Sequence, residues 1–162
     1  MLNVQHRVIH ASAAEVGAII DRVTSPDESV WPAAAWPPLV LDRGLVPGSR
    51  GGHGPIRYHL TEYKPGRRIL FAFEPHSGLD GHHELTITPE GPDRCRLTHT
   101  IDSATRGRMR ILWPTMVRWL HEALMRDLLD NAERAATGRL SGPPARWSPW
   151  VRLLRRTHGA KR

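Results

Sequence analysis

Histidine is the residue type in this chain best suited to acid–base chemistry near neutral pH, and the sequence contains 10 of them. His83 and His99 each lie in a segment whose alternate residues are apolar, so both are expected to share a strand face with leucine and isoleucine. An imidazole on such a face can donate or accept a proton inside a pocket. We therefore take His99 and His83 as candidate catalytic residues; the alternative is that each is a hydrogen-bonded core residue.

Two further polar side chains fall on inward faces by the same alternation. In residues 55–63, Ile56, Tyr58 and Leu60 share one face, and Glu62 continues it if no bulge intervenes. Burial would raise the pKa of a carboxyl group and suit it to act as a base. Glu62 is therefore the third candidate catalytic residue, and Tyr58 is a candidate for ligand binding.

Metal and phosphate sites have weaker support in the sequence. His82 and His83 point to opposite faces of one strand, and Cys-x-x-Cys and Glu-x-x-His spacings are absent, so metal binding would need His53, His59 and His76 to meet through the fold. The glycine-rich segment 48–54 lacks the Gly-Lys-Ser/Thr ending of a phosphate loop and favours a tight turn. We expect no metal site and no cofactor.

The elements that must position these residues follow from periodicity and turn residues. Strands are predicted over residues 4–10, 39–43, 55–63, 68–74, 82–89 and 94–102, with tight turns that favour one antiparallel sheet. Ser12 and Glu15 form a capping box for a helix over about 13–23. Ser25 and Pro26 predict a second short helical turn.

A long helix is predicted from Pro114 to Gly138, followed by a last short helix over Trp150–Arg156 that ends near Gly159. Val117, Leu120 and Leu124 lie on the apolar stripe of the long helix, and His121 lies at its edge. Such a helix can pack into the curve of the sheet and leave a cavity between them.

Four segments resemble the SRPBCC superfamily, the group that includes START and Bet v1-like proteins and the polyketide cyclase/dehydrase and lipid transport proteins. They are residues 7–16, which run from a first strand into a first helix, the glycine-rich residues 48–54, the hairpin over 56–73, and the helix over 112–138. The resemblance covers about residues 3–138. It implies an α+β helix-grip fold, in which a curved antiparallel sheet surrounds a long C-terminal helix and two short helices follow the first strand. It carries over no catalytic motif.

Inward alternation and the helix stripe together define the predicted pocket. Its expected ligand-binding residues are Tyr58, Leu60, Phe71, Phe73, Leu85, Leu97, Trp31, Trp36, Val117, Leu120, His121 and Leu124. Mostly apolar walls with a few polar groups are typical of small-molecule sites. Trp31 and Trp36 lie where the family has its pocket entrance, and either form a gate over the ligand or plug the open end of the fold.

The net charge of +7 belongs to one end of the sequence. Residues 139–162 hold seven basic residues and no acid, so residues 1–138 hold 16 of each sign and are neutral. A basic groove across the fold, and with it specific nucleic-acid binding, is therefore not expected. We divide the chain into a ligand-binding domain over 1–138 and a basic Trp/Arg-rich tail over 139–162. This tail could contact an anionic membrane or a partner, dock on its own domain, or stay disordered.

We predict that the protein binds a small hydrophobic molecule, aromatic, polyketide-like or lipid-like, with or without cyclase or dehydratase chemistry. The alternative is a non-catalytic interaction module whose basic tail contacts an anionic membrane or a protein partner. The sequence shows no secretory signal or transmembrane segment, and its single cysteine excludes an intramolecular disulfide, so a cytoplasmic location is expected. It indicates no particular oligomeric state.

Overall fold

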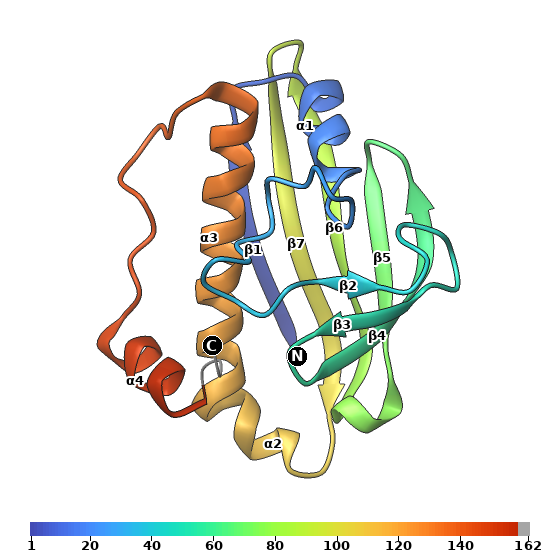
Figure 1. Ribbon diagram of the computed structural model, residues 1–162, viewed down its shortest axis with the longest axis vertical. Helices are drawn as coiled ribbons and strands as arrows, with labels where there is room; N and C mark the ends of the chain where they lie inside the picture. The colour runs from blue at the N-terminus through green and yellow to red at the C-terminus, as the bar shows by residue number, and fades with distance from the viewer. Residues whose placement is uncertain (159–162) are drawn as a thin grey trace.

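The computed structural model describes residues 1–158, which form one antiparallel sheet curved around a long helix (Figure 1). The strand order is β1-β7-β6-β5-β4-β3-β2, and every neighbouring pair is antiparallel. The strands are β1 (Leu2–Ile9), β2 (Val40–Leu41), β3 (Arg50–His53), β4 (Ile56–Lys64), β5 (Arg68–Phe73), β6 (Leu79–Gly91) and β7 (Arg94–Thr105). The predicted α+β helix-grip fold is confirmed.

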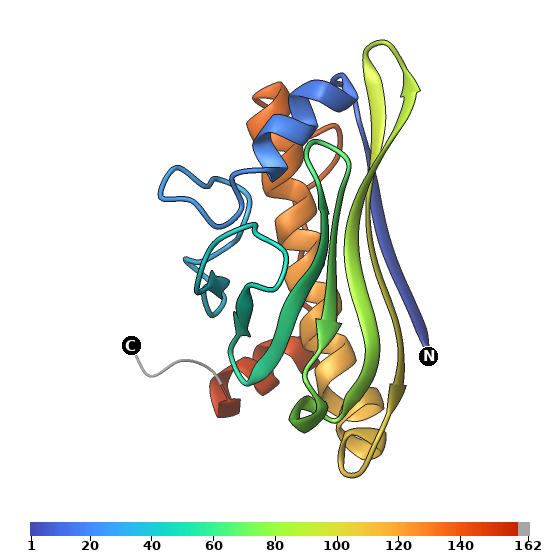
Figure 2. The ribbon, with the colours of Figure 1, turned by 90° about the vertical axis from the view of Figure 1, so that its right-hand side faces the viewer.

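Helices α1 (Ala13–Ile20) and α3 (Arg118–Thr137) cover one face of this sheet. The other helical elements are the 3-10 turn η1 (Pro75–Ser77), α2 (Met109–Leu112), the π-helical turn η2 (Trp113–Val117) and α4 (Pro149–His158). Figure 2 shows α1 and α3 on the same face of the sheet, which buries that face. Within residues 1–158, none of the helices combines the length and apolar composition needed to cross a membrane.

The first helix starts as predicted, but the second predicted helical turn is wrong. The Ser12 hydroxyl accepts the Glu15 N–H at 3.2 Å, and the Glu15 carboxylate accepts the Ser12 N–H at 2.8 Å, which is a capping box. Residues 25–28 form a turn instead of a helix. There the Glu28 carboxylate accepts the N–H groups of Val30 and Trp31, at 3.0 and 2.7 Å. These bonds hold the loop that carries Trp31.

The strand predicted over residues 39–43 is reduced to Val40–Leu41. The Asp42 N–H still donates to the Arg50 carbonyl at 2.9 Å, but the Asp42 carboxylate accepts the Ser49 hydroxyl and the Arg50 N–H, each at 2.8 Å, so a side chain takes the Arg50 N–H at this point. These local bonds compete with strand pairing, as short polar side chains commonly do.

The long helical region starts five residues before Pro114, at Met109, and it is not α-helical throughout. Proline has no N–H to donate, and here it lies in a π-helical turn whose closing bond runs from the Arg118 N–H to the Trp113 carbonyl. Gly138 ends α3 with a φ of 74°, as predicted, in the left-handed conformation that favours glycine.

An ion-pair cluster ties β1 to α3. Arg7 of β1 donates to Asp130 and to Glu133 of α3, both at 2.5 Å, and the two acidic residues are 4% and 2% exposed. The remaining carboxylate oxygens accept the N–H groups of Ser141 and Ala145, at 3.0 and 2.7 Å. Burial alone would raise the pKa of Glu133, but the bonds from Ser141 and Arg7 outweigh it and leave that pKa below its usual value.

The tail docks on the domain over its described part, residues 139–158. It runs beside α3 and ends in α4 (Figure 1), where Val151 and Leu154 are buried. The Trp147 indole donates to Asp127 of α3 at 2.9 Å, and the Trp150 indole donates to the Thr115 carbonyl at 3.0 Å. Of the three alternatives for the tail, self-docking describes this part; Gly159, Lys161 and Arg162 lie outside the described residues.

Candidate functional site

A cavity of about 350 Å³ lies between the sheet, the N-terminal half of the long helical region and α4. Its wall is mostly apolar and aromatic. This volume is within the range of small-molecule sites, which begins at about 300 Å³. The cavity is therefore large enough for a compact ring system.

Most of the predicted pocket residues line this cavity. They are Trp31, Trp36, Tyr58, Phe71, Phe73, His83, Leu85, His99, Val117, Leu120, His121 and Leu124. Strand alternation and the helix stripe thus bring together side chains from β4, β5, β6, β7 and the long helical region. Their roles in binding or catalysis remain predictions.

Leu60 and Leu97 are corrections to the predicted pocket. Both side chains point inward and are fully buried, but neither lines the cavity. The inward face of β6 and β7 is divided along its length, because α1 packs directly on both strands and fills the space there. Alternation predicts the face of a side chain, but it does not predict what covers that face.

Glu62 is also a correction, because it does not reach the cavity. The pairing of β4 with β5 shifts register between Leu60 and Glu62, and this bulge turns Glu62 away from the inward face. Its carboxylate instead pairs with Lys64 and Arg68, each at 2.7 Å. The bond from Lys64 is the largest contribution to a lowered pKa for Glu62, opposite to the raised pKa expected of a buried base. We drop Glu62 as a catalytic candidate.

The polar groups of the cavity form a histidine row, defined here as His53, His83, His99 and His121, with Tyr58 between the first two. His53 Nδ1 lies 2.9 Å from the Tyr58 hydroxyl, and the Tyr58 and His83 rings meet edge to face at 4.5 Å. His83 Nδ1 lies 3.4 Å from His99 Nε2, and the His99 and His121 rings are 4.9 Å apart. The row therefore crosses the cavity wall from β3 to α3.

Three ring nitrogens in the row are buried without a hydrogen-bond partner: His83 Nε2, His99 Nδ1 and His121 Nδ1. A neutral imidazole carries one N–H and one lone pair. If His99 donates to His83, then His83 Nε2–H and the His99 Nδ1 lone pair remain unused; the opposite tautomers exchange these roles. In either state the pair keeps one free donor and one free acceptor.

Burial keeps these histidines uncharged. It lowers the pKa of His53 to about 4 and those of His83, His99 and His121 well below 6.5, and the neighbouring histidines lower the last three further. Burial also raises the pKa of Tyr58. At neutral pH the row is therefore a set of neutral donors and acceptors in an apolar wall.

The row is not a metal centre in the described part of the chain, where no group of three His, Cys, Asp or Glu side chains is arranged to hold a metal ion. His53 and His59, considered above with His76 as metal ligands, point to different places. His53 lines the cavity, whereas His59 Nδ1 lies 3.1 Å from the Glu74 carboxylate.

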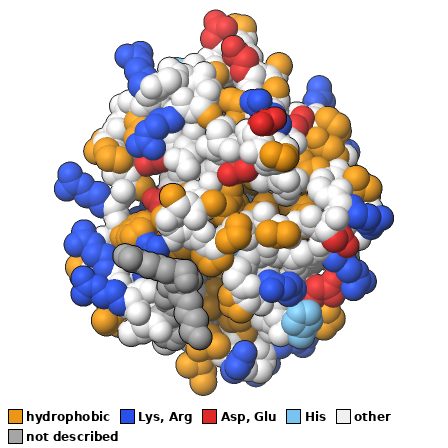
Figure 3. All heavy atoms as spheres, viewed as in Figure 1, with side chains coloured by type: hydrophobic (Ala, Val, Ile, Leu, Met, Phe, Trp, Pro, Cys, Tyr) orange, Lys and Arg blue, Asp and Glu red, His pale blue; other side chains and the backbone are white. Residues whose placement is uncertain are grey.

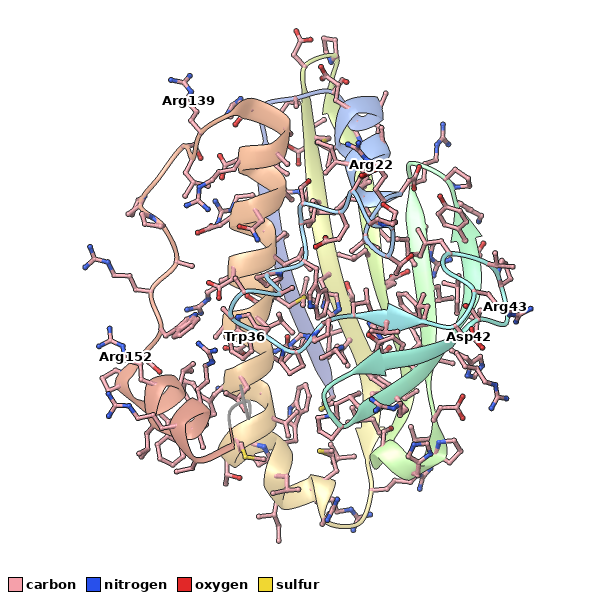
Figure 4. The ribbon with its side chains drawn as sticks, viewed as in Figure 1. Arg22, Trp36, Asp42, Arg43, Arg139 and Arg152 are labelled. Carbon is pink, nitrogen blue, oxygen red and sulfur yellow. The ribbon has the colours of Figure 1, made fainter. Side chains whose placement is uncertain are left out.

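Trp31 and Trp36 line the cavity from the loop between α1 and β2, and both are buried. The Trp31 indole donates to the Pro37 carbonyl at 2.9 Å, and the Trp36 indole donates to Asp127 at 2.7 Å. Figure 4 shows Trp36 beside α3, far from Asp42 and Arg43 at the other edge of the molecule. These bonds hold both rings in place as part of the wall.

Several residues that line the cavity were not among the expected ligand-binding residues. Met125 and Leu128 follow His121 and Leu124 by four residues each, so the helical period contained the signal. Ile101 follows His99 by two residues on the same strand face. Leu154 and Arg155 of α4 had no such signal, because their position depends on how the tail docks.

A curved sheet around a long helix, with an apolar cavity between them, defines a helix-grip protein. The sequence profile of the family described as "Polyketide cyclase / dehydrase and lipid transport" matches residues 1–137. The chain belongs to this family. Comparison with curated protein sequences gives no match.

Solved structures share the fold at low sequence identity. Norcoclaurine synthase from Thalictrum flavum, in complex with dopamine and hydroxybenzaldehyde, is 14% identical with a TM-score of 0.60, covering 88% of this chain and 90% of that one. CalU16 from Micromonospora echinospora is 18% identical with a TM-score of 0.57, covering 98% and 83%. A protein from Thermobifida fusca is 15% identical with a TM-score of 0.59, covering 83% and 94%.

Proposed function

We propose that this protein binds a small, mainly apolar molecule, aromatic, polyketide-like or lipid-like, and that the histidine row orients the molecule's polar group. The observation that carries the proposal is a 350 Å³ apolar cavity with buried, unpartnered imidazole nitrogens in its wall. An unpartnered buried polar group costs about 1–3 kcal/mol, so folding alone does not favour this arrangement. The dopamine complex of norcoclaurine synthase, which has a similar fold, is consistent with a ring-containing ligand.

Binding is tested with N-phenyl-1-naphthylamine, an uncharged dye that fluoresces in apolar sites. We expect saturable binding to the purified protein and loss of most of it in Leu120→Trp, because the indole fills the cavity that Leu120 lines. Ile111→Trp is the matched control, since Ile111 is 70% exposed on α2 and lies outside the cavity. Equal dye binding by both variants would refute the proposal. Native mass spectrometry of the purified protein would identify a co-extracted ligand.

Proton transfer in the cavity is the second candidate function, as in a cyclase or dehydratase. It is supported by the His83–His99 pair, since a neutral imidazole can accept a proton at one nitrogen and release one at the other. Holding a reactive chain in place could supply much of the rate, without a conspicuous motif.

The small aromatic probe 5-nitrobenzisoxazole reports a buried base. The base removes the ring C–H proton while the ring N–O bond breaks to give a cyanophenolate. We expect a rate above that of buffer that is lost in His83→Phe/His99→Phe while N-phenyl-1-naphthylamine still binds. A rate equal to that of buffer, or one that the double variant retains, would leave the protein as a binder without this chemistry.

The alternative role, in which the basic tail contacts a membrane or a partner, has less support. Trp147, Val151 and Leu154, which such a contact would use, pack on the domain instead. Trp150 and Leu153 remain partly exposed, at 44% and 49%.

A further inference from the structure

A second hollow adjoins the cavity at α4. It is lined by Trp147, Arg152, Arg155 and Arg156, and Arg155 also lines the apolar cavity. The two spaces therefore meet at one side chain. We call this second hollow the arginine rim.

Arg155 lies where the two spaces meet and stacks on two indole rings. Its guanidinium carbon lies 3.9 Å from the centre of the Trp147 ring and 4.8 Å from that of Trp36, and it donates to the Ala35 carbonyl. Asp127 is the nearby acid and accepts both indole N–H groups. The Arg155 guanidinium is thus occupied by contacts within the protein.

Arg152 and Arg156, by contrast, remain available to a ligand. Both are exposed on one face of α4, and within residues 1–158 neither forms an ion pair with a carboxylate. Residues 139–158 contain no acid that could neutralise them. In Figure 3, Lys and Arg side chains gather along the side of the molecule where Figure 1 places α4, and Figure 4 labels Arg152 there.

We infer that the ligand is an amphiphilic anion, whose apolar body fills the cavity and whose carboxylate, sulfonate or phosphate group lies at Arg152 and Arg156. This inference rests on the proposed function and specifies the class of ligand. Guanidinium groups bind such oxyanions through paired, charge-assisted hydrogen bonds. An uncharged ligand would gain nothing from them. The family match ends at residue 137, so this anion site belongs to a segment beyond it.

Two dyes with the same ring skeleton separate the anion site from the cavity. 1-Anilinonaphthalene-8-sulfonate carries a sulfonate, and N-phenyl-1-naphthylamine is the same molecule without it. At low salt, we expect the full chain to bind the sulfonate dye more tightly than the neutral dye. Its affinity should fall about tenfold in Arg152→Ala/Arg156→Ala, since two charge-assisted contacts of modest strength are lost. The neutral dye should change less than about twofold.

The matched control is Arg139→Ala/Arg146→Ala. Arg139 and Arg146 are exposed on the same tail but line neither space, so this variant loses the same charge elsewhere. We expect it to bind both dyes as the parent chain does. Equal loss of sulfonate affinity in both double variants would show an effect of net charge alone and would overturn the inference.

The remaining outcomes are distinct. If neither dye binds the parent chain, the proposed function fails and the inference fails with it. If both dyes bind but Arg152→Ala/Arg156→Ala changes neither, the cavity stands and the anion site is refuted. If that variant lowers co-sedimentation with phosphatidylglycerol vesicles and leaves the sulfonate dye unaffected, the arginines serve a membrane surface and the inference is also refuted.

Discussion

The chain buries polar groups against its sheet in two places along α3, and the two places differ in how those groups are satisfied. Toward the C-terminal end of α3, the ion-pair cluster of Arg7, Asp130 and Glu133 uses its carboxylate oxygens in ion pairs and tail N–H bonds. Toward the N-terminal end, the histidine row leaves three ring nitrogens without a partner. The ion-pair cluster is closed and paired, whereas the histidine row lines the cavity.

The difference separates polar groups that hold the fold from polar groups that the fold leaves without a partner. The ion-pair cluster joins β1, α3 and the tail, and removing one member leaves a buried charge unpaired. The histidine row is neutral, so it can remain without partners at a smaller cost. This comparison can be tested by substitutions with opposite expected signs.

The largest effect is expected from Arg7→Met. It leaves Asp130 and Glu133 as neighbouring buried carboxylates without a cation. The free energy of unfolding should fall by about 3 kcal/mol, as for other broken buried pairs, in urea denaturation monitored by circular dichroism. Arg106→Ala is the control, because the Arg106–Asp80 pair is exposed and should contribute less than about 1 kcal/mol. Equal losses in the two variants would show that the buried cluster contributes no more to stability than an exposed ion pair does.

The next effect is on how the free energy of unfolding depends on pH, which should differ between the histidine row and the ion-pair cluster. The unfolded chain binds protons on histidine below about pH 6.5, whereas folded His53 does so only near pH 4 and the other three well below 6.5. Above pH 6.5 the histidine row therefore leaves the free energy of unfolding independent of pH. As the pH falls from 6.5 toward 4, the free energy of unfolding decreases, because these histidines bind protons only in the unfolded chain. Each group can contribute up to about 1.4 kcal/mol per pH unit in that window.

The ion-pair cluster acts in a lower window. Since the pKa of Glu133 lies below 4.5, its contribution is present above that pH and is lost as the pH falls through the folded value. Between pH 4.5 and 7, the free energy of unfolding from urea denaturation should rise less steeply with pH in His83→Phe/His99→Phe than in the parent chain. The slope should be unchanged in Arg106→Ala, whose ion pair is exposed. A slope that the histidine substitutions do not alter would contradict the assignment.

The smallest effect is expected from the same histidine substitutions at pH 7. Phenylalanine keeps the ring shape and removes both the unpartnered nitrogens and the weak 3.4 Å bond. The free energy of unfolding should stay constant or rise by up to about 1 kcal/mol, because no polar group is left unsatisfied in its place. A loss above about 2 kcal/mol would instead mean that the pair stabilises the fold as the ion-pair cluster does.

The sequence predicted the sheet, the long helix and most of the cavity wall, because periods of 2 and 3.6 residues are local properties. His83, His99 and Leu124 were placed in this way. Glu62 was misplaced because one extra residue in a ladder reverses every later side chain, and nothing in the sequence marks that bulge. The start of the helical region was misplaced because Pro114 lies in a π-helical turn instead of a first turn.

The tail was the least predictable part. Its composition allowed docking, membrane contact or disorder, and the choice rests on contacts with residues far away in the chain, such as Trp147 with Asp127. His53 was likewise considered only as a metal ligand, although its partner Tyr58 was already placed in the pocket. Pairs of this kind depend on the full fold.

The order of elements along the chain has a consequence for biosynthesis. All seven strands and α3 precede α4, so a ribosome translates the complete sheet and its gripping helix before Leu154 and Arg155 exist. The part of the cavity wall that α4 supplies is therefore the last part to be synthesised. The strands and α3 are complete in sequence before α4 is translated, so only the share of the wall that Leu154 and Arg155 contribute depends on the last helix.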